Sequence, residues 1–318
     1  MRKRIIFNVV LILGVVALGA ALWFTRPGPP PARETVSALA PGEISHIEVH
    51  TRDNVIELAR DEDNGRWRMI EPAQARADAT RIAALLELAA RTPEHRYARD
   101  AVAADKTGVD DADLTLRFND EAPIAIGHEG PSPGTRYVRT AHALLLVKSG
   151  HLEEQPLGWT RWIAPGLLAA DARLTRLTLP RATLTRSDNG GWQVVPANAD
   201  RGADYAQATI DAWHYSRALA VEPLDASRER IARVTLQFAD EPARHLDVIA
   251  RAPELVLRDA ALGVDYHMAA NQAGPLLDMQ HPDILRQSRG NDLQPSAIPL
   301  TDPGANTEPP AEGSSSAN

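Results

Sequence analysis

The sequence predicts an α+β protein: an N-terminal transmembrane helix followed by two tandem copies of a mostly antiparallel sheet, each with one packed helix. Three observations lead to this prediction. The chain has an uncharged apolar run near its start, collinear sequence matches between its two halves, and alternating apolar residues that each half interrupts with one helical stripe. At 318 residues it has room for two ordinary domains and a linker.

Residues 5–24 (IIFNVVLILGVVALGAALWF) begin with Ile5, end with Phe24 and contain no charge. As a helix they would span roughly 30 Å, the thickness of a bilayer's hydrocarbon core. The basic residues that precede them, in the stretch 1–4, place the N-terminus in the cytoplasm by the positive-inside rule. The sequence thus predicts a single-pass protein of a bacterial inner membrane, with its bulk in the periplasm. A cleaved signal peptide is the alternative, and it would export the same bulk.

The remaining boundaries follow from composition. Residues 1–24 form the cytoplasmic tip and anchor, and residues 25–42 a Pro-rich linker that favours stiff polyproline II. Residues 288–318 are rich in Pro, Ser, Asn and Gly, which predicts a disordered tail. Between them we expect copy 1 at 43–150, a Trp-containing connector at 151–171 and copy 2 at 172–287.

An internal duplication is the strongest signal in the sequence. Residues 112–121 (ADLTLRFNDE) and 232–241 (ARVTLQFADE) are identical at six of ten positions. Asp-Asn-Gly-Arg-Trp67 matches Asp-Asn-Gly-Gly-Trp192 upstream, and Val-Arg-Thr-Ala141 resembles Leu-Arg-Asp-Ala260 downstream. Because these matches keep their order along the chain, we infer that one unit was duplicated.

Each copy is predicted to contain three strands, a helix and then three or four more strands. In copy 1 the helix begins after Asp78, a good N-cap, and Ile82, Leu85, Leu86 and Ala89 form its apolar stripe. In copy 2 the helix opens near Asp204 and carries Ile210 and Trp213. One amphipathic helix covering one face of such a sheet makes a small α+β domain.

Charge and cysteine content exclude several kinds of function. The net charge is −8, and it becomes −11 once the three basic residues of the N-terminal tip are set aside. So acidic a remainder of the chain does not predict nucleic-acid binding, which needs a basic face. The absence of cysteine excludes thiolate metal sites and a Cys nucleophile.

The motif His46-Ile-Glu48-Val-His50 is the most suggestive of metal binding, since all three polar side chains would share one strand face. The two His would lie roughly 13 Å apart, too far for one zinc ion, so a solvated face is favoured. The other histidines have no H-x-x-x-H or H-E-x-x-H spacing, and surface or core positions are predicted for them: His95, His128, His142, His151, His214, His245, His267 and His281.

Two repeated motifs have a structural and a functional interpretation each. Asp120-Glu121 and Asp240-Glu241 resemble paired acid/base carboxylates, but each follows a strand and precedes Pro, which favours a hairpin turn. Trp67 and Trp192 occupy equivalent positions, for which core packing is favoured over ligand binding.

Trp159 and Trp162, three residues apart in the connector, are the candidates for a partner-binding surface. Packing between the two copies is the favoured alternative for them. The sequence predicts no catalytic residue, no metal site and no cofactor.

The motifs at Ile44–Val49, Asp63–Pro72, Ala77–Ile82, Asp113–Phe118 and Arg136–Arg139 together resemble the bacterial family named domain of unknown function 4340. The resemblance covers about residues 43–270. It implies an exported or membrane-anchored protein, encoded in many cases beside ABC-transporter components of the gliding-motility auxiliary type. It carries over no catalytic residues.

The function expected from these observations is that of a non-enzymatic accessory or scaffold subunit with an inner-membrane partner of the transporter type. The transporter link rests on the resemblance alone. One alternative is a periplasmic module that binds glycan or peptide in the groove between the copies. An envelope hydrolase, which would need distant carboxylates or His to converge, is the less favoured alternative.

Overall fold

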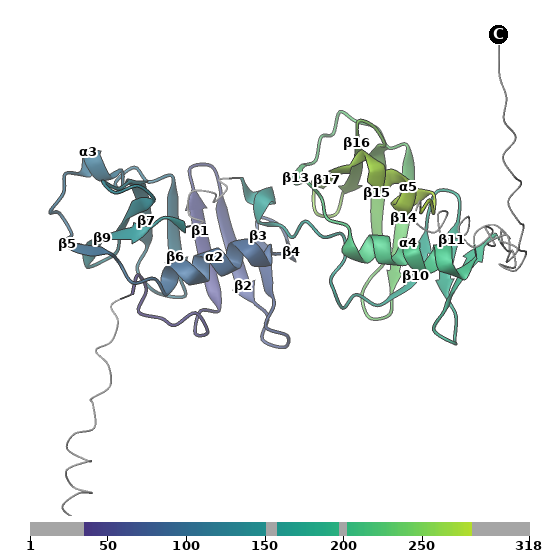
Figure 1. The fold of residues 1–318 in the computed structure, drawn as a ribbon, viewed down its shortest axis with the longest axis horizontal. Coiled ribbons are helices and arrows are strands. Elements are labelled where there is room, and N and C mark those ends of the chain that lie inside the picture. Colours follow the sequence, from purple (N-terminus) through teal and green to yellow (C-terminus); the bar gives the residue numbers. More distant parts are fainter. Residues whose placement is uncertain (1–34, 151–157, 197–201, 282–318) are drawn as a thin grey trace, which may run out of the picture.

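A computed structural model describes residues 35–150, 158–196 and 202–281. They form two antiparallel sheets side by side along the long axis of the molecule, each with a helix packed against it (Figure 1). The protein is therefore mostly β, with few helices. The predicted anchor, the linker up to residue 34 and the tail lie outside the described residues. None of the helices in the described ranges has the length and hydropathy of a membrane-spanning segment.

The sheet of copy 1 has nine strands in the order β4-β3-β2-β1-β6-β7-β8-β9-β5. Their bounds are β1 His46–Thr51, β2 Val55–Arg60, β3 Trp67–Glu71, β4 Ala75–Arg76, β5 His95–Ala98, β6 Leu114–Phe118, β7 Ile124–Glu129, β8 Thr135–Arg139 and β9 Ala143–Lys148. Helix α2 (Ala79–Ala89) lies between β4 and β5 in the chain, and the short helix α3 (Ala104–Thr107) precedes β6.

The sheet of copy 2 has eight strands in the order β12-β11-β10-β14-β15-β16-β17-β13. Their bounds are β10 Leu174–Thr178, β11 Thr183–Arg186, β12 Trp192–Val195, β13 Ala220–Pro223, β14 Ala232–Phe238, β15 Arg244–Ala250, β16 Glu254–Asp259 and β17 Val264–Ala269. Helix α4 (Ala203–Tyr215) follows β12; the short helices η3 (Ala270–Gln272) and α5 (Ala273–Leu277) follow β17.

The strand order of copy 2 repeats that of copy 1, with only β4 added at one edge of copy 1. In both copies the strand after the helix crosses to the far edge and pairs with the last strand of its sheet. These crossing strands, β5 and β13, are among the elements that the sequence pattern does not predict. Both strands are short. Three of the four residues of β5 are exposed, so its sequence lacks the alternation of apolar and polar residues that predicts a strand.

Each helix packs where its apolar stripe predicts. Helix α2 buries Ile82, Leu85, Leu88 and Ala89, and Asp78 caps its N-terminus by accepting a 2.9 Å hydrogen bond from the amide of Thr80. Leu86, expected in the stripe, is only partly buried. In copy 2, Trp213 of α4 is fully buried and its indole donates a 2.9 Å hydrogen bond to the carbonyl of Leu276 in α5.

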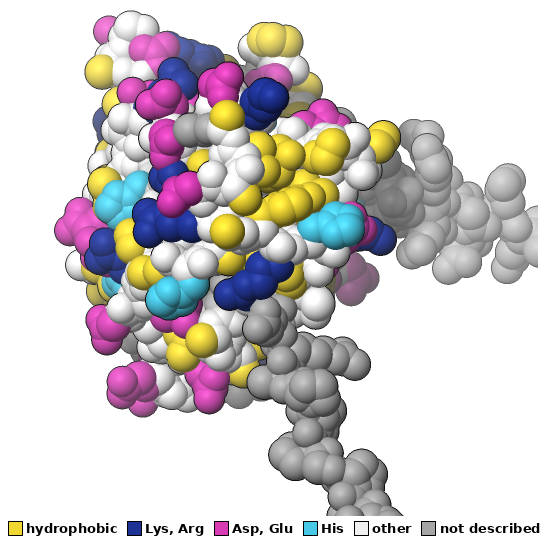
Figure 2. Space-filling view, turned by 90° about the vertical axis from the view of Figure 1, so that its left-hand side faces the viewer, with side chains coloured by type: hydrophobic (Ala, Val, Ile, Leu, Met, Phe, Trp, Pro, Cys, Tyr) yellow, Lys and Arg dark blue, Asp and Glu magenta, His cyan; other side chains and the backbone are white. Residues whose placement is uncertain are grey.

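The outer face of the copy 1 sheet carries a second, smaller core made of Val109, Ala125 and Leu144. It forms because the segment that contains α3 crosses this face of the sheet. Figure 2 looks onto the end of copy 1 that lies away from copy 2. Hydrophobic side chains form a band there, among charged side chains of both signs.

Candidate functional site at the junction of the two copies

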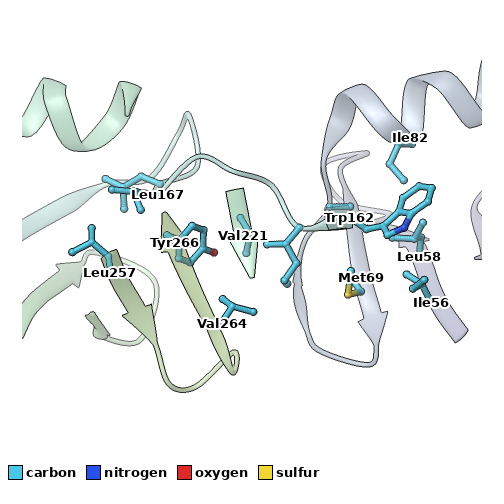
Figure 3. Packing of buried hydrophobic residues seen from close by; sticks show 14 of the residues in the cluster. Ile56, Leu58, Met69, Ile82, Trp162, Leu167, Val221, Leu257, Val264 and Tyr266 are labelled. Atoms are coloured by element: carbon cyan, nitrogen blue, oxygen red, sulfur yellow. The ribbon is translucent and has the colours of Figure 1, made fainter. Parts of the chain in front are cut away.

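The connector joins the copies through buried apolar residues. Its short helix η2 (Trp159–Trp162) places the indole of Trp162, which is fully buried, among side chains of copy 1 that include Leu58, Met69 and Ile82 (Figure 3). The Trp162 side chain is thus not accessible to a partner in this structure. Trp159 is half-buried and packs against the same core.

The backbone of the connector bridges the edges of the two sheets. On the copy 1 side, the amide of Asp78 donates to the carbonyl of Trp162 and the amide of Ala164 donates to the carbonyl of Arg76, both at 2.8 Å. On the copy 2 side, the amide of Ala218, which precedes β13, donates to the carbonyl of Pro165 at 2.9 Å. The connector is therefore hydrogen-bonded to both units, with an isolated β-bridge to each of them (Ala77 with Ile163, and Gly166 with Arg217).

Two arginines from opposite copies bind three successive carbonyl groups of the connector. Arg76 of β4 donates to the carbonyls of Gly166 and Leu168, the latter at 3.0 Å. Arg244 of β15 donates to the carbonyl of Leu167 at 2.6 Å. These bonds satisfy buried carbonyl groups that would otherwise be costly to leave unpaired.

The surroundings of the two guanidinium groups differ. Burial lowers the pKa of Arg76, and the positive charge of Arg244 lowers it further. Burial also acts to lower the pKa of Arg244. The neighbouring Tyr266 and Asp259 have a larger opposite effect, so the pKa of Arg244 is raised. Asp259 lies 2.6 Å from the Arg244 guanidinium, whereas no described carboxylate forms an ion pair with Arg76.

A cleft of about 590 Å³ opens at this junction. Its walls come from the β2–β3 turn, β3 and β4 of copy 1, from the connector, and from the β14–β15 and β16–β17 ends of copy 2. The lining includes aromatic and aliphatic residues as well as charged ones. The volume falls within the range of small-molecule sites.

The His46-Glu48-His50 motif lies on the outer face of the copy 1 sheet, on the central strand β1. His50 contacts one oxygen of Glu48 at 3.0 Å, His46 lies 3.9 Å from the other, and Arg117 lies 3.5 Å away. The hydrogen bond from His50 is the main cause that lowers the pKa of Glu48. Across the described residues, no group of three His, Asp or Glu side chains is placed to hold a metal ion.

The repeated acidic pairs both lie in hairpin turns, between β6 and β7 and between β14 and β15. Glu121 accepts hydrogen bonds from the hydroxyl of Ser37 at 2.7 Å and from the amide of Ala38 at 3.1 Å, and so holds the segment that enters copy 1. Asp240 pairs with Arg173. These roles are structural. Glu241, in contrast, lines the junction cleft.

The remaining histidines and the repeated Trp residues are dispersed. His267 lies between Glu254 and Glu222, His245 contacts Thr235, and His281 contacts Thr209, while His151 falls outside the described residues. Trp192 is buried in copy 2, whereas its counterpart Trp67 is half-buried and lines the cleft.

The residues that form the junction were not among the sequence candidates, apart from Trp67, Glu241 and the connector Trp residues. Arg76 and Arg244 lie 168 positions apart, and no periodic pattern links them. The one signal available was a difference between the copies. Arg66 and Arg68 beside Trp67 align with Gly191 and Gln193 beside Trp192, so these arginines are not required by the repeated fold.

A family model described as "Domain of unknown function (DUF4340)" matches residues 67–243. The match runs from β3 of copy 1 across the connector to the turn after β14 of copy 2, so it contains most of the cleft. No curated protein and no solved structure matches the chain. Because the family model covers more than half of the sequence, the chain belongs to the family of the domain of unknown function DUF4340.

Proposed function

We propose that this chain is a membrane-anchored accessory protein of the bacterial inner membrane, without catalytic activity of its own, whose periplasmic part is a rigid scaffold. Its partner is an inner-membrane complex of the ABC-transporter type. The uncharged run of residues 5–24 behind a basic tip supports the anchor. The transporter link rests on the family resemblance described above.

The junction is the observation on which the scaffold role depends. Two sheet units joined by a free linker would move independently, as is the default for domains with small interfaces. Here the connector is hydrogen-bonded to both units, and its Trp162 is buried in the core of copy 1. A fixed spacing between two sheets suits a protein that holds partners at a set distance.

Topology is tested first, with reporter fusions to the full chain. Alkaline phosphatase joined after residue 287 should be active, and a green fluorescent reporter at the same position should be dark. An inactive phosphatase together with a bright fluorescent reporter would reject the periplasmic placement.

Partner capture is tested second. A tagged full-length chain, cross-linked in cells and extracted in mild detergent, should co-purify transporter subunits identified by mass spectrometry. The matched control replaces residues 1–24 with a cleavable signal peptide, which exports the same folded part without the anchor and should lose most of the capture. Recovery of the chain alone in both cases would count against an accessory role.

A further inference from the structure

The junction cleft carries an unusual set of charges for an acidic protein. Strands β3 and β4 pair so that the backbone of Arg68 stands directly opposite that of Arg76, and Arg66 lies two positions before Arg68, just ahead of β3. All three line the cleft. The copy 1 wall of the cleft therefore carries three guanidinium groups.

The acidic side chains nearby balance only part of this charge. Arg66 pairs with Asp171, and Arg244 at the cleft floor pairs with Asp259. Neither Arg68 nor Arg76 forms an ion pair with a carboxylate of the described residues. The two terminal nitrogens of Arg76 donate to carbonyl groups of the connector. Its Nε and its other N–H groups form no hydrogen bond with the described residues, so they remain as donors for a ligand.

Comparison of the two copies shows that the fold does not need these groups. Ile124 occupies on β7 the position that Arg244 has on β15, because each stands opposite the equivalent leucine of the preceding strand. By the same pairing, Leu145 corresponds to Tyr266. At these positions the other copy has an apolar residue. The charged and polar groups therefore occur on the sides of the two copies that face the cleft, and the repeated fold does not require them.

We propose that this cleft binds a short peptide through its C-terminal carboxylate, with Arg68 and Arg76 as the carboxylate-binding residues. A guanidinium presents N–H donors in a planar fork that matches a carboxylate, and Arg68 and Arg76 line the same cleft.

The rest of the cleft suits the remainder of such a ligand. Trp67, Phe238 and Leu262 provide apolar walls for side chains. The lining also includes Asp61 and Glu241, whose carboxylates can accept hydrogen bonds from peptide N–H groups or from a free amino terminus. Because the lining carries charges of both signs, it disfavours ligands with several negative charges. This inference concerns a ligand site and does not depend on the anchor or on a transporter partner.

The test uses the full-length chain purified in mild detergent and an equimolar library of tripeptides with free carboxylates. The same library as C-terminal amides is the chemical control, and inorganic phosphate is the simple-anion control. Binding is followed by saturation-transfer NMR, and the strongest tripeptide is then titrated by calorimetry. We expect binding of free-carboxylate tripeptides, with affinity at least about tenfold above that of the amides.

Three variants link binding to the cleft. Arg68→Gln introduces the residue that copy 2 carries at the same place, so it should fold normally and weaken binding about tenfold. Arg76→Gln should weaken it further, but it also removes connector contacts. Arg176→Gln, an exposed arginine of β10 away from the cleft, should change nothing.

Equal binding of acids and amides would overturn the proposal. So would phosphate that competes as strongly as the best tripeptide, or a folded Arg68→Gln protein with unchanged affinity. Absence of binding by the free-carboxylate library would overturn it as well, while leaving the accessory role intact, because that role is judged by partner capture.

Discussion

A single arginine at the same place in each copy ties down the loop that crosses the outer sheet face. In copy 1, Arg139 of β8 donates to the carbonyl of Val109 at 3.0 Å and pairs with Asp110. In copy 2, Arg258 of β16 donates to the carbonyls of Asp225 and Arg228. The match between Val-Arg-Thr-Ala141 and Leu-Arg-Asp-Ala260 in the sequence thus reflects a repeated side-chain role.

Arg258 should be among the most important polar residues for stability. It forms two bonds, of 2.8 and 2.9 Å, with Asp265, whose side chain is buried. Arg258→Ala leaves that carboxylate buried without a counter-charge, so we expect a loss of about 3–5 kcal/mol in the free energy of unfolding, measured by urea denaturation. Arg233→Ala, which removes an exposed partner of Asp247, is the control and should cost far less. Equal losses would show that burial does not set the strength of these pairs.

His281 gives the folded protein a pH dependence of predictable sign. Burial lowers the pKa of His281 below its ordinary value of 6.5, and its Nε2 lies 2.9 Å from the hydroxyl of Thr209 in α4. Because folding depresses this pKa, its contribution to stability is complete above pH 6.5 and is lost as the pH falls towards the folded-state pKa.

The measurement is the urea midpoint at about pH 7.5 and about pH 5, for the wild type and for His281→Asn. The wild type should lose more stability between the two pH values than the variant does. A variant with the same pH dependence as the wild type would assign the effect to other groups.

At the scale of elements, the sequence predicted the features that depend on local chemistry. The cap at Asp78, the stripe with Ile82 and Leu85, and the start of the second helix near Asp204 all depend on residues close together in the chain, and the structure confirms them. Strands β5 and β13 were missed because pairing with a distant strand, and not their own alternation, makes them strands. Arg76 and Arg244 were missed for a related reason, since only the docking of one copy on the other brings them together.

The crossing of the α3 segment over β7 depends on a glycine. A Cβ at Gly127 would lie 2.1 Å from the carbonyl oxygen of Thr107 and 2.6 Å from the side chain of Val109. Gly127→Ala should therefore displace this segment and lower the free energy of unfolding by about 1–3 kcal/mol, as overpacking does. Hydrogen exchange of residues 99–113 should rise at the same time. Gly42→Ala is the matched control, because a Cβ there meets nothing within 4 Å.

At the scale of the whole molecule, the buried connector should make the two copies unfold together. The larger of the two hydrophobic clusters is continuous and includes Trp162, Leu167 and residues of both sheets. Two-state unfolding requires that different probes report the same transition. We expect the circular dichroism and fluorescence of the full chain to change at one urea midpoint.

Trp162→Ala should break this coupling. The substitution removes a fully buried indole from the core of copy 1, at a cost of about 3–5 kcal/mol. Copy 1 should then unfold first, so that hydrogen exchange followed by mass spectrometry shows its strands losing protection while β14 to β17 of copy 2 retain theirs. Trp159→Ala, at a half-buried position three residues earlier, should lower the midpoint less and keep a single transition. Uniform loss of protection in both copies of the Trp162 variant would mean that the sheets are coupled by contacts other than the connector, and the rigid spacing on which the scaffold role depends would then have to be attributed to those contacts.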